Sequence, residues 1–408
     1  MKKPLPKSKS LKQAKTYSIF AIGCQQNWYD AEKIAHTLDL LGLFPETVDT
    51  ADLIVILSCS VRQKSVDKLY GFINKWRKIK PRHIILTACI LPADRKTFAT
   101  KVDAIIEDQQ IYEYLIDSIP HADNITLADL PADHHKEGLN VKMVADHAFV
   151  PITFGCNNYC TFCAVPHTRG REVSRPKTLV LAETNKLFKK GIKKITLLGQ
   201  NVNSYGLSDF TPRNLRKNKD QSGVKWSKSN PSPFVELLND IEKNIPLESL
   251  SFLSPNPQDF APDLIDWMSK SKIFSRSLNL PLQSGNDKVL KQMNRRYTSK
   301  EYLTLLQKIR QAVPDIVVST DIIVGFPNES AEDFADTVKL CQKANFNKAF
   351  IGIFSPRPGT TAAKIYPDNV PMAVKKERFK ILNELINSQE LLINPATGGR
   401  QSSSFAKL

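Results

Sequence analysis

The sequence predicts an α/β protein with two domains, an N-terminal parallel sheet followed by a partial barrel of six strand–helix units. Length supports two domains, because 408 residues exceed the size at which a single hydrophobic core usually stops growing. Apolar strand-like runs alternate with helical stretches up to residue 125, which is typical of a parallel sheet. Beyond residue 146 the alternation continues through six further strands, as expected for a curved sheet that forms part of a barrel.

The N-terminal region begins with a lysine-rich segment, residues 1–15. No apolar stretch follows this segment, so we expect a disordered basic arm rather than a secretion signal. The N-terminal domain itself is predicted over residues 16–125. Its three clearest strands are residues 16–24, 52–60 and 83–90.

Each of these strands ends at or next to a cysteine: Cys24, Cys59 and Cys89. The carboxyl ends of parallel strands meet at one edge of a sheet, which is where ligands bind in open sheets. Strand-end cysteines can also be small buried hydrophobes. Their occurrence at three strands in succession favours a shared site.

The barrel is predicted over residues 147–378, after an interdomain linker at residues 126–146. Its six strands are residues 148–156, 193–206, 247–257, 275–285, 315–327 and 348–360. The intervening helices are residues 177–191, 233–244, 261–271, 299–313 and 330–345. The strand ends, which form the working face of such a barrel, carry Cys156, Gly199, Ser254, Gln283, Gly325 and Arg357. Residues 379–408 are expected to form a C-terminal helix and a polar tail.

The composition favours a polyanionic partner. Lys and Arg number 57 against 41 Asp and Glu, a net charge of +16, for which nucleic acid is the commonest partner. A charge that serves only colloidal stability is the alternative. The polar loop at residues 207–232 adds Trp226 and a group of basic residues, so it is either an RNA contact or a solvated loop. The basic residues of this loop are Arg213, Arg216, Lys217, Lys219, Lys225 and Lys228.

The sequence favours a cytoplasmic protein without membrane contact. No stretch approaches the ~20 apolar residues needed to cross a bilayer. Seven cysteines in a chain without a secretion signal indicate a reducing compartment, and metal or catalytic thiols rather than a disulfide framework. Cys341 lies within a helical pattern and is expected to pack in the core.

Three cysteines lie within eight residues of one another: Cys156, Cys160 and Cys163. A structural zinc site commonly uses two Cys-x-x-Cys pairs, and the chain has no second pair. A [4Fe–4S] cluster takes one thiolate per iron, so three cysteines leave one iron open to a small molecule. This spacing, after the first strand of a partial barrel, predicts a catalytic cluster.

This loop, with Phe162 next to its last cysteine, resembles the cluster loop of the radical S-adenosylmethionine superfamily. The resemblance implies that the open iron binds S-adenosylmethionine and that the reduced cluster generates a 5′-deoxyadenosyl radical. It also implies that the barrel is a radical SAM core barrel. Phe162, Gly199, Gln200 and Gln283 are the expected cofactor contacts, with Cys156, Cys160 and Cys163 as the catalytic cluster ligands.

A longer resemblance, from Tyr17 to Leu382, is to the methylthiotransferases of that superfamily. The segments that carry it are GCQQNWYDAE, ADLIVILSCSVRQKSVDK, TRGREVSRP, LLGQNVNSYG, LPLQSGNDKVLKQMNRRYT and STDIIVGFP. It implies that residues 16–125 form a methylthiotransferase domain in which Cys24, Cys59 and Cys89 hold a second [4Fe–4S] cluster. Methylthiotransfer replaces an aromatic C–H bond by C–S–CH3. Radical chemistry suits this reaction, since an unactivated aromatic C–H has neither an acidic proton nor a leaving group.

Within this family, VPHTRG and FSPRPGT are similar to the branch that acts on isopentenyl-modified adenosine at tRNA position 37. Arg357 and Pro358 stand where the ribosomal-protein branch tends to carry acidic residues. We therefore expect methylthiolation of tRNA by a monomer, with a flavodoxin- or ferredoxin-like electron donor and a sulfur donor. Another modified tRNA adenosine, a ribosomal-protein aspartate, or a non-enzymatic iron–sulfur RNA-binding protein are the alternatives.

The sequence departs from the family pattern at three places. ILPAD follows Cys89 where the family usually has an AQ-containing continuation, and Asn256 and Asn279 stand where histidine is common. The resemblance also implies a small C-terminal RNA-binding barrel. Eighteen mostly polar residues follow Glu390, too few for such a barrel, so we expect the chain to lack it.

Overall fold

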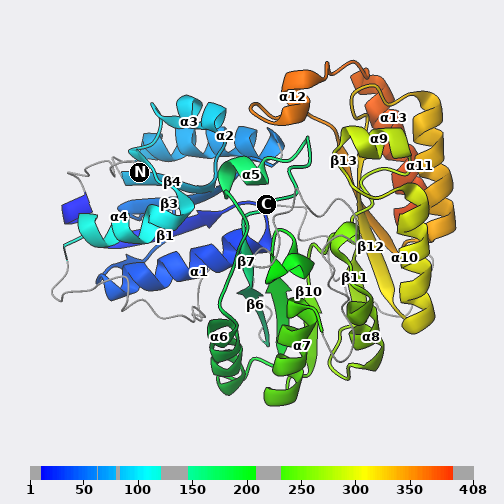
Figure 1. Cartoon of the computed structure of the whole chain (residues 1–408). Helices are drawn as coiled ribbons and strands as arrows, with labels where there is room; N and C mark the ends of the chain where they lie inside the picture. Colours follow the sequence, from blue (N-terminus) through cyan, green and yellow to red (C-terminus); the bar gives the residue numbers. More distant parts are fainter. Residues whose placement is uncertain (1–10, 62, 80–82, 121–145, 208–230, 389–408) are drawn as a thin grey trace.

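The computed structural model describes residues 11–61, 63–79, 83–120, 146–207 and 231–388. Within these ranges a parallel-sheet domain packs beside an open barrel (Figure 1). This arrangement confirms the predicted fold class. Nearly all of the predicted linker and of the basic loop lie outside the described residues, as does the polar tail. No helix in the described part of the chain has the length and apolar character needed to cross a bilayer.

The N-terminal sheet has five parallel strands in the order β2-β1-β3-β4-β5. These are β1 (Thr16–Ala21), β2 (Phe44–Pro45), β3 (Leu53–Cys59), β4 (His83–Cys89) and β5 (Ala104–Ile105). The helices are α1 (Gln25–Leu40), α2 (Gln63–Ile79), α3 (Pro92–Phe98) and α4 (Ile111–Ser118). Apolar residues of α1 and α4 cover one face of the sheet, and those of α2 and α3 cover the other. Burial on both faces explains why β3 reads as a continuous apolar run.

The predicted disordered arm at residues 1–15 is too long. Residues 11–13 form a short 3-10 helix, and Leu11 is fully buried among apolar side chains of α1 and α4. One leucine among lysines and serines gives no periodic signal in the sequence, although burying its side chain contributes about 1.5–3 kcal/mol. Residues 1–10 lie outside the described residues.

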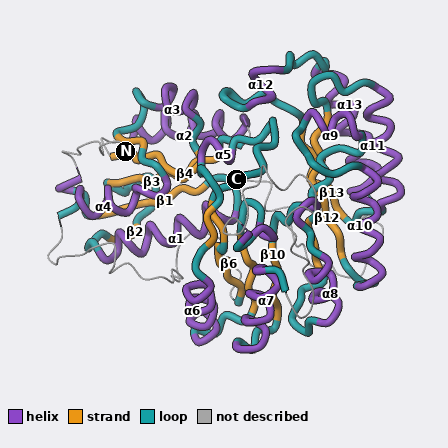
Figure 2. The backbone as a smooth tube through the Cα atoms, viewed as in Figure 1, coloured by secondary structure: helices purple, strands orange, loops and turns teal. Residues whose placement is uncertain are grey.

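The barrel is an arc of six parallel strands in chain order. They are β6 (His147–Pro151), β9 (Lys194–Leu198), β10 (Ser249–Phe252), β11 (Ser277–Asn279), β12 (Val317–Val324) and β13 (Lys348–Ile353). Two groups of three, β6-β9-β10 and β11-β12-β13, are joined by a parallel bridge between Leu250 and Phe274. The tube in Figure 2 shows helices along the outer side of these strands.

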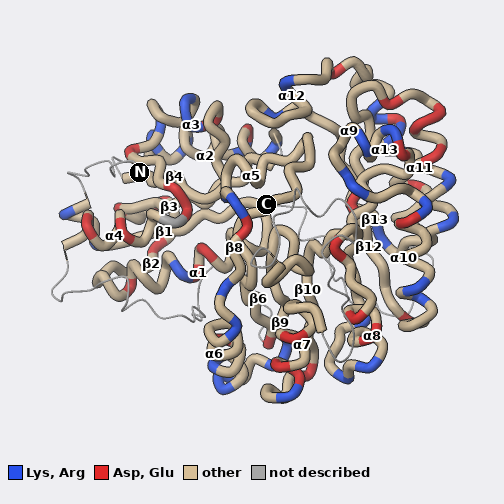
Figure 3. Tube along the Cα trace, in the orientation of Figure 1, with Lys and Arg blue, Asp and Glu red and all other residues tan. Residues whose placement is uncertain are grey.

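The outer helices of the barrel are α6 (Lys177–Lys189), α7 (Pro233–Asn244), α8 (Pro262–Lys270), α10 (Ser299–Ala312), α11 (Ala331–Ala344) and α13 (Met372–Asn387). Three shorter helices are α5 (Val165–Thr168), α9 (Asp287–Gln292) and α12 (Thr361–Ile365). Capping boxes at Thr298 and Ser330 set the starts of α10 and α11. Lys, Arg, Asp and Glu lie largely on the outer helices (Figure 3).

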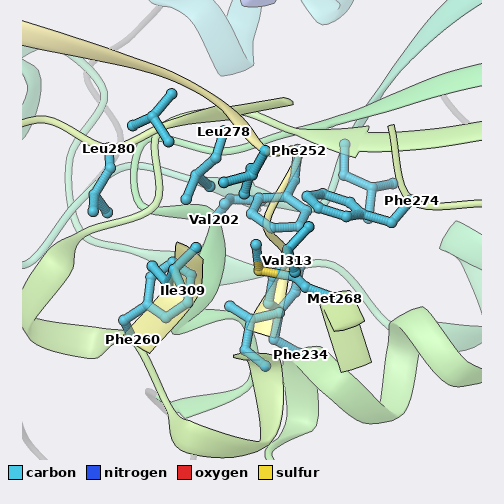
Figure 4. Close-up of a cluster of buried hydrophobic side chains, with 14 of the residues drawn as sticks. Val202, Phe234, Phe252, Phe260, Met268, Phe274, Leu278, Leu280, Ile309 and Val313 are labelled. Carbon is cyan, nitrogen blue, oxygen red and sulfur yellow. The ribbon is translucent and has the colours of Figure 1, made fainter. Parts of the chain in front are cut away.

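The barrel core is apolar and includes several aromatic rings. Phe234, Phe252 and Phe274 pack together, with Met268 nearby and Leu278 and Leu280 above them (Figure 4). Cys341 is also buried in this core, as predicted.

Two boundaries differ from the sequence prediction. Helix α13 crosses the proposed boundary at residue 379, because Leu382 and Ile386 continue its apolar face into the barrel core. The predicted first barrel strand is two elements: β6 ends at Pro151, and β7 (Thr153–Phe154) pairs antiparallel with β8 (Val173–Ser174). This hairpin carries the chain into the loop of three cysteines.

Candidate active site

The three cysteines of the N-terminal domain lie at one edge of its sheet. Cys59 and Cys89 are the last residues of β3 and β4 and stand directly opposite each other in the parallel register. Cys24 precedes the first residue of α1. Cys59 and Cys89 are buried, whereas Cys24 is exposed. We call these residues the N-terminal trio.

Electrostatic interactions within the trio are visible at Cys89. The pKa of its thiol is raised to about 12, mainly by burial; Arg169 opposes this shift, and negative charge on Cys24 and Cys59 adds to it. Metal ligation requires the thiolate. Cys89 therefore favours its ligand form only when a cation or a metal compensates the buried charge.

The barrel cysteines, Cys156, Cys160 and Cys163, form the barrel trio on the loop between β7 and α5. Gly155 starts this loop with φ +69°, and a Cβ there would stand 2.2 Å from the carbonyl oxygen of Arg171. Only glycine fits this close approach.

The last residue of α9 and the segment after it hold the other side of this loop. The Thr161 Oγ1 hydroxyl donates to the carbonyl of Gln292 at 2.8 Å, and Asn294 Nδ2 donates to the carbonyls of Asn158 and Tyr159 at 3.2 and 3.0 Å. Arg295 Nη1 lies 3.4 Å from Cys160 Sγ. These contacts fix the loop against the barrel.

A cavity of ≈ 330 Å³ lies where the two domains meet, and both trios contribute to it. Cys24 lines it from the N-terminal domain, and Cys156, Cys160 and Cys163 line it from the barrel. The four expected cofactor contacts, Phe162, Gly199, Gln200 and Gln283, also line it. Cys59 and Cys89 lie outside this lining.

Other residues of the lining were not predicted as site residues. They are Gln25, Gln26, Val61, Asn158, Val165, Leu198, Leu253, Ser254, Pro255, Asn256, Pro281, Arg295 and Asp321. A strand-end position is the signal that marks Ser254, which follows β10, the third barrel strand. Asn256, one of the two departures from histidine, faces this cavity, whereas Asn279 bonds Ser319 within the sheet.

Backbone strain marks two positions of the lining. Ser254 has φ +60° and Gln283 has φ +68°, a conformation that costs non-glycine residues about 1–2 kcal/mol. Strain of this kind persists where the surrounding structure enforces it, commonly at binding sites. The strained residues follow β10 and β11, so the strand ends of the barrel are shaped toward the cavity.

Two buried arginines of the barrel reach into the N-terminal domain. Arg169, which follows α5, bonds Asn27, Asp30, Cys89 and Asp108. Arg357 follows β13 and donates to Asp94 Oδ2 at 2.8 Å and to Gln63. Asp94 belongs to the ILPAD segment and also accepts from Ser60 Oγ at 2.7 Å.

Arg357 does not line the cavity. Its guanidinium is buried against Asp94, so the side-chain contacts of Arg357 described here are with the N-terminal domain and not with the cavity.

Both trios consist of cysteines, whose thiolates are the usual ligands of iron–sulfur clusters. Within the described ranges, no three His, Cys, Asp or Glu side chains converge closely enough to hold one metal ion. In a [4Fe–4S] cluster each thiolate binds a different iron. Three cysteines in each trio, with an arginine beside Cys89 and another beside Cys160, fit the ligand set of such a cluster.

Comparison with known proteins agrees with this fold and site. The model of the Radical SAM superfamily matches residues 150–341, and the model described as Uncharacterized protein family UPF0004 matches residues 16–107. The chain is therefore a radical S-adenosylmethionine enzyme, which uses S-adenosylmethionine and a [4Fe–4S] cluster.

The chain belongs to the family of the tRNA-2-methylthio-N(6)-dimethylallyladenosine synthases, a class of transferases. It is 35% identical over 378 residues to the protein of that name from Thermotoga petrophila, covering 90% of this chain and 81% of the relative. It is 37% identical over 408 residues to that from Carboxydothermus hydrogenoformans, covering 93% and 85%.

Among solved structures, the radical S-adenosylmethionine methyltransferase TsrM from Kitasatospora setae has a similar fold. The TM-score is 0.59 at 13% identity, over 86% of this chain and 75% of that one. At this identity the likeness shows the fold alone.

Proposed function

We propose that this protein adds a methylthio group to C2 of isopentenyl-modified adenosine at tRNA position 37, using S-adenosylmethionine and two [4Fe–4S] clusters. The observation that carries the proposal is the cavity between the domains, which is lined by Cys24 of the N-terminal trio and by all three cysteines of the barrel trio. Sulfur insertion at an unactivated carbon requires a radical generator and a sulfur donor beside the same substrate atom. A cavity into which two clusters each present an open iron would meet that requirement.

Each trio has its own role in this proposal. Cys156, Cys160 and Cys163 hold the radical-generating cluster, and the N-terminal trio holds the second one. Three thiolates leave one iron of each cluster without a protein ligand. When bound, the clusters supply one-electron chemistry and a sulfur acceptor or donor position.

The remaining residues of the cavity bind and orient the reactants. Phe162, Gly199, Gln200 and Gln283 form the S-adenosylmethionine site in this proposal. Gly199 leaves no room for a side chain, because a Cβ there would stand 2.3 Å from Thr153 Oγ1. Partial enclosure of the cavity by two domains limits the access of water to a radical.

Family membership and charge support the proposed tRNA substrate. The relatives named above carry tRNA and dimethylallyladenosine in their names, and the net charge of +16 favours a polyanion. We infer that the protein acts in the cytoplasm as a monomer and receives electrons from a flavodoxin- or ferredoxin-like donor. Consumption of the cluster sulfur requires a separate sulfur donor.

Iron content tests the two clusters. Four proteins are reconstituted without oxygen: wild type, a triple alanine variant of each trio, and Cys341→Ala as the matched control for loss of a cysteine in the core. We expect about eight irons per chain in wild type and control, and about four in each triple variant. Four irons in the wild type would contradict the second cluster.

Activity tests the division of roles and the substrate. The variant without the N-terminal trio should still cleave S-adenosylmethionine when reduced, yet yield no methylthio product. Mass spectrometry of nucleosides from isopentenyl-modified tRNA should show the methylthio derivative only with wild type and Cys341→Ala. Absence of this product with fully loaded wild type would refute the proposed substrate.

A further inference from the structure

Arg169 is a barrel residue whose side chain is buried in the N-terminal domain. Only 2% of the side chain is exposed. It occupies the position just after α5, six residues beyond Cys163, and every side chain that it bonds belongs to the N-terminal domain. In Figure 1, α5 lies between the two domains.

The guanidinium has four acceptors. Nε donates to Cys89 Sγ at 3.0 Å, Nη1 to Asp108 Oδ2 at 2.8 Å, and Nη2 to Asn27 Oδ1 at 2.8 Å and Asp30 Oδ2 at 3.2 Å. The planar fork of arginine matches this spread of acceptors, which one lysine ammonium cannot reach simultaneously.

These contacts fix the base of the N-terminal trio. Asn27 Nδ2 donates at 2.6 Å to the carbonyl of Ile22, two residues before Cys24, and at 2.8 Å to the carbonyl of Ser58, next to Cys59. Arg169 binds the oxygen of the same amide and the sulfur of Cys89. One side chain of the barrel thus contacts both the segment that leads to Cys24 and the end of β4.

Asp30 and Asp108 make this contact hard to replace. Both carboxylates bond Arg169, and the pKa of Asp30 is raised to about 7, mainly by burial and also by Asp108, while Arg169 opposes the shift. A buried carboxylate that loses its cation is left uncompensated. Loss of Arg169 would therefore loosen the surface on which the barrel docks.

We propose that Arg169 is a positioning residue that docks the cluster loop of the barrel onto the N-terminal trio and tunes the cluster held there through its N–H···S bond to Cys89. Docking is a property of the metal-free chain. The tuning rests on the proposed function, because it requires a cluster at the N-terminal trio. A positive hydrogen-bond donor at a ligand sulfur favours the reduced cluster, since reduction adds negative charge.

The docking is tested by hydrogen exchange of the metal-free protein. Arg169→Gln should raise amide exchange at residues 22–30 and at the end of β4 roughly tenfold or more, because local opening no longer breaks a buried ion network. Arg77→Gln is the matched control, since Arg77 pairs with Asp103 on the surface of the same domain. Equal exchange in Arg169→Gln and the control would overturn the docking role.

The tuning is tested by redox titration of protein in which Cys156, Cys160 and Cys163 are alanine, so that only the N-terminal cluster remains. Adding Arg169→Gln should lower the midpoint potential of this cluster. At a fixed solution potential the ratio of reduced to oxidised cluster should fall about tenfold, which for one electron corresponds to about 59 mV. Arg169→Lys should shift the midpoint potential by an intermediate amount. If the glutamine variant does not fold, the lysine variant tests the tuning role in its place. An unchanged potential would overturn the tuning role.

The exchange and redox experiments together distinguish a failure of this inference from a failure of the proposed function. Absence of iron from the triple alanine background would refute the second cluster and the tuning with it, while the exchange experiment still decides the docking.

Discussion

Gly23→Ala tests whether the N-terminal trio depends on a close backbone approach. Gly23 has φ +120°, and a Cβ there would stand 2.7 Å from Cys59 Cβ and 3.1 Å from Cys59 Sγ. Gly42 is the matched control: its φ is +81°, but no atom lies within 4 Å of an added Cβ. Both substitutions incur a positive-φ penalty, and both lower the conformational entropy of the unfolded chain. The overlap with Cys59 is specific to Gly23.

The overlap sets the size of the effect. Overpacking of a buried site typically costs about 1–3 kcal/mol, so the free energy of unfolding should fall by that much more in Gly23→Ala than in Gly42→Ala. Urea unfolding of the metal-free proteins, followed by circular dichroism, measures this difference. Iron analysis after reconstitution should show about four irons in Gly23→Ala and about eight in Gly42→Ala, because the displaced side chain carries a cluster ligand. Equal stability and equal iron in the two variants would refute this reasoning.

Three further predictions follow from buried or cavity-lining side chains. Gln200→Ala should weaken S-adenosylmethionine binding about tenfold, the loss expected for one hydrogen bond, as measured by calorimetry. An unchanged Kd would mean that Gln200 only shapes the barrel rim. Arg357→Gln leaves Asp94 without its buried cation and should lower the free energy of unfolding by about 3–5 kcal/mol, against about 0–1 kcal/mol for Arg276→Gln at an exposed pair with Asp315. Burial raises the pKa of Glu32 from 4.5 to about 8, so the folded chain holds a proton that the unfolded chain releases, and stability falls as pH rises between these values. The Tm of wild type should therefore fall relative to that of Glu32→Gln between pH 5 and 8, and parallel curves would contradict this account.

Local patterns in the sequence were sufficient to predict the fold class. Strands rich in Val, Ile and Leu, separated by amphipathic helices, led to a parallel sheet and an arc of six strands. The rule that ligands gather at strand ends also grouped residues far apart in sequence, such as Cys59 and Cys89, which the structure places in direct register.

Contacts that lack a periodic signal were not predictable. Arg169 bonds residues 61 to 142 positions away, and nothing in their spacing identifies the partners. Leu11 is a single apolar residue in a basic segment, so its burial is a tertiary effect. Likewise, Arg295 approaches Cys160 because α9 returns the chain to the cluster loop, a geometry that depends on the assembled barrel.

The short helix α5 links the two halves of the site by its length. It occupies Val165–Thr168, between the last cysteine of the barrel trio and Arg169. Because each helical residue advances the chain by about 1.5 Å and turns it by about 100°, one inserted residue would point the guanidinium away from Cys89 while leaving all three barrel cysteines in place. We therefore expect a one-residue insertion in α5 to preserve radical generation and to abolish sulfur transfer. The length of α5 would then matter to the reaction as much as the cysteines that precede it.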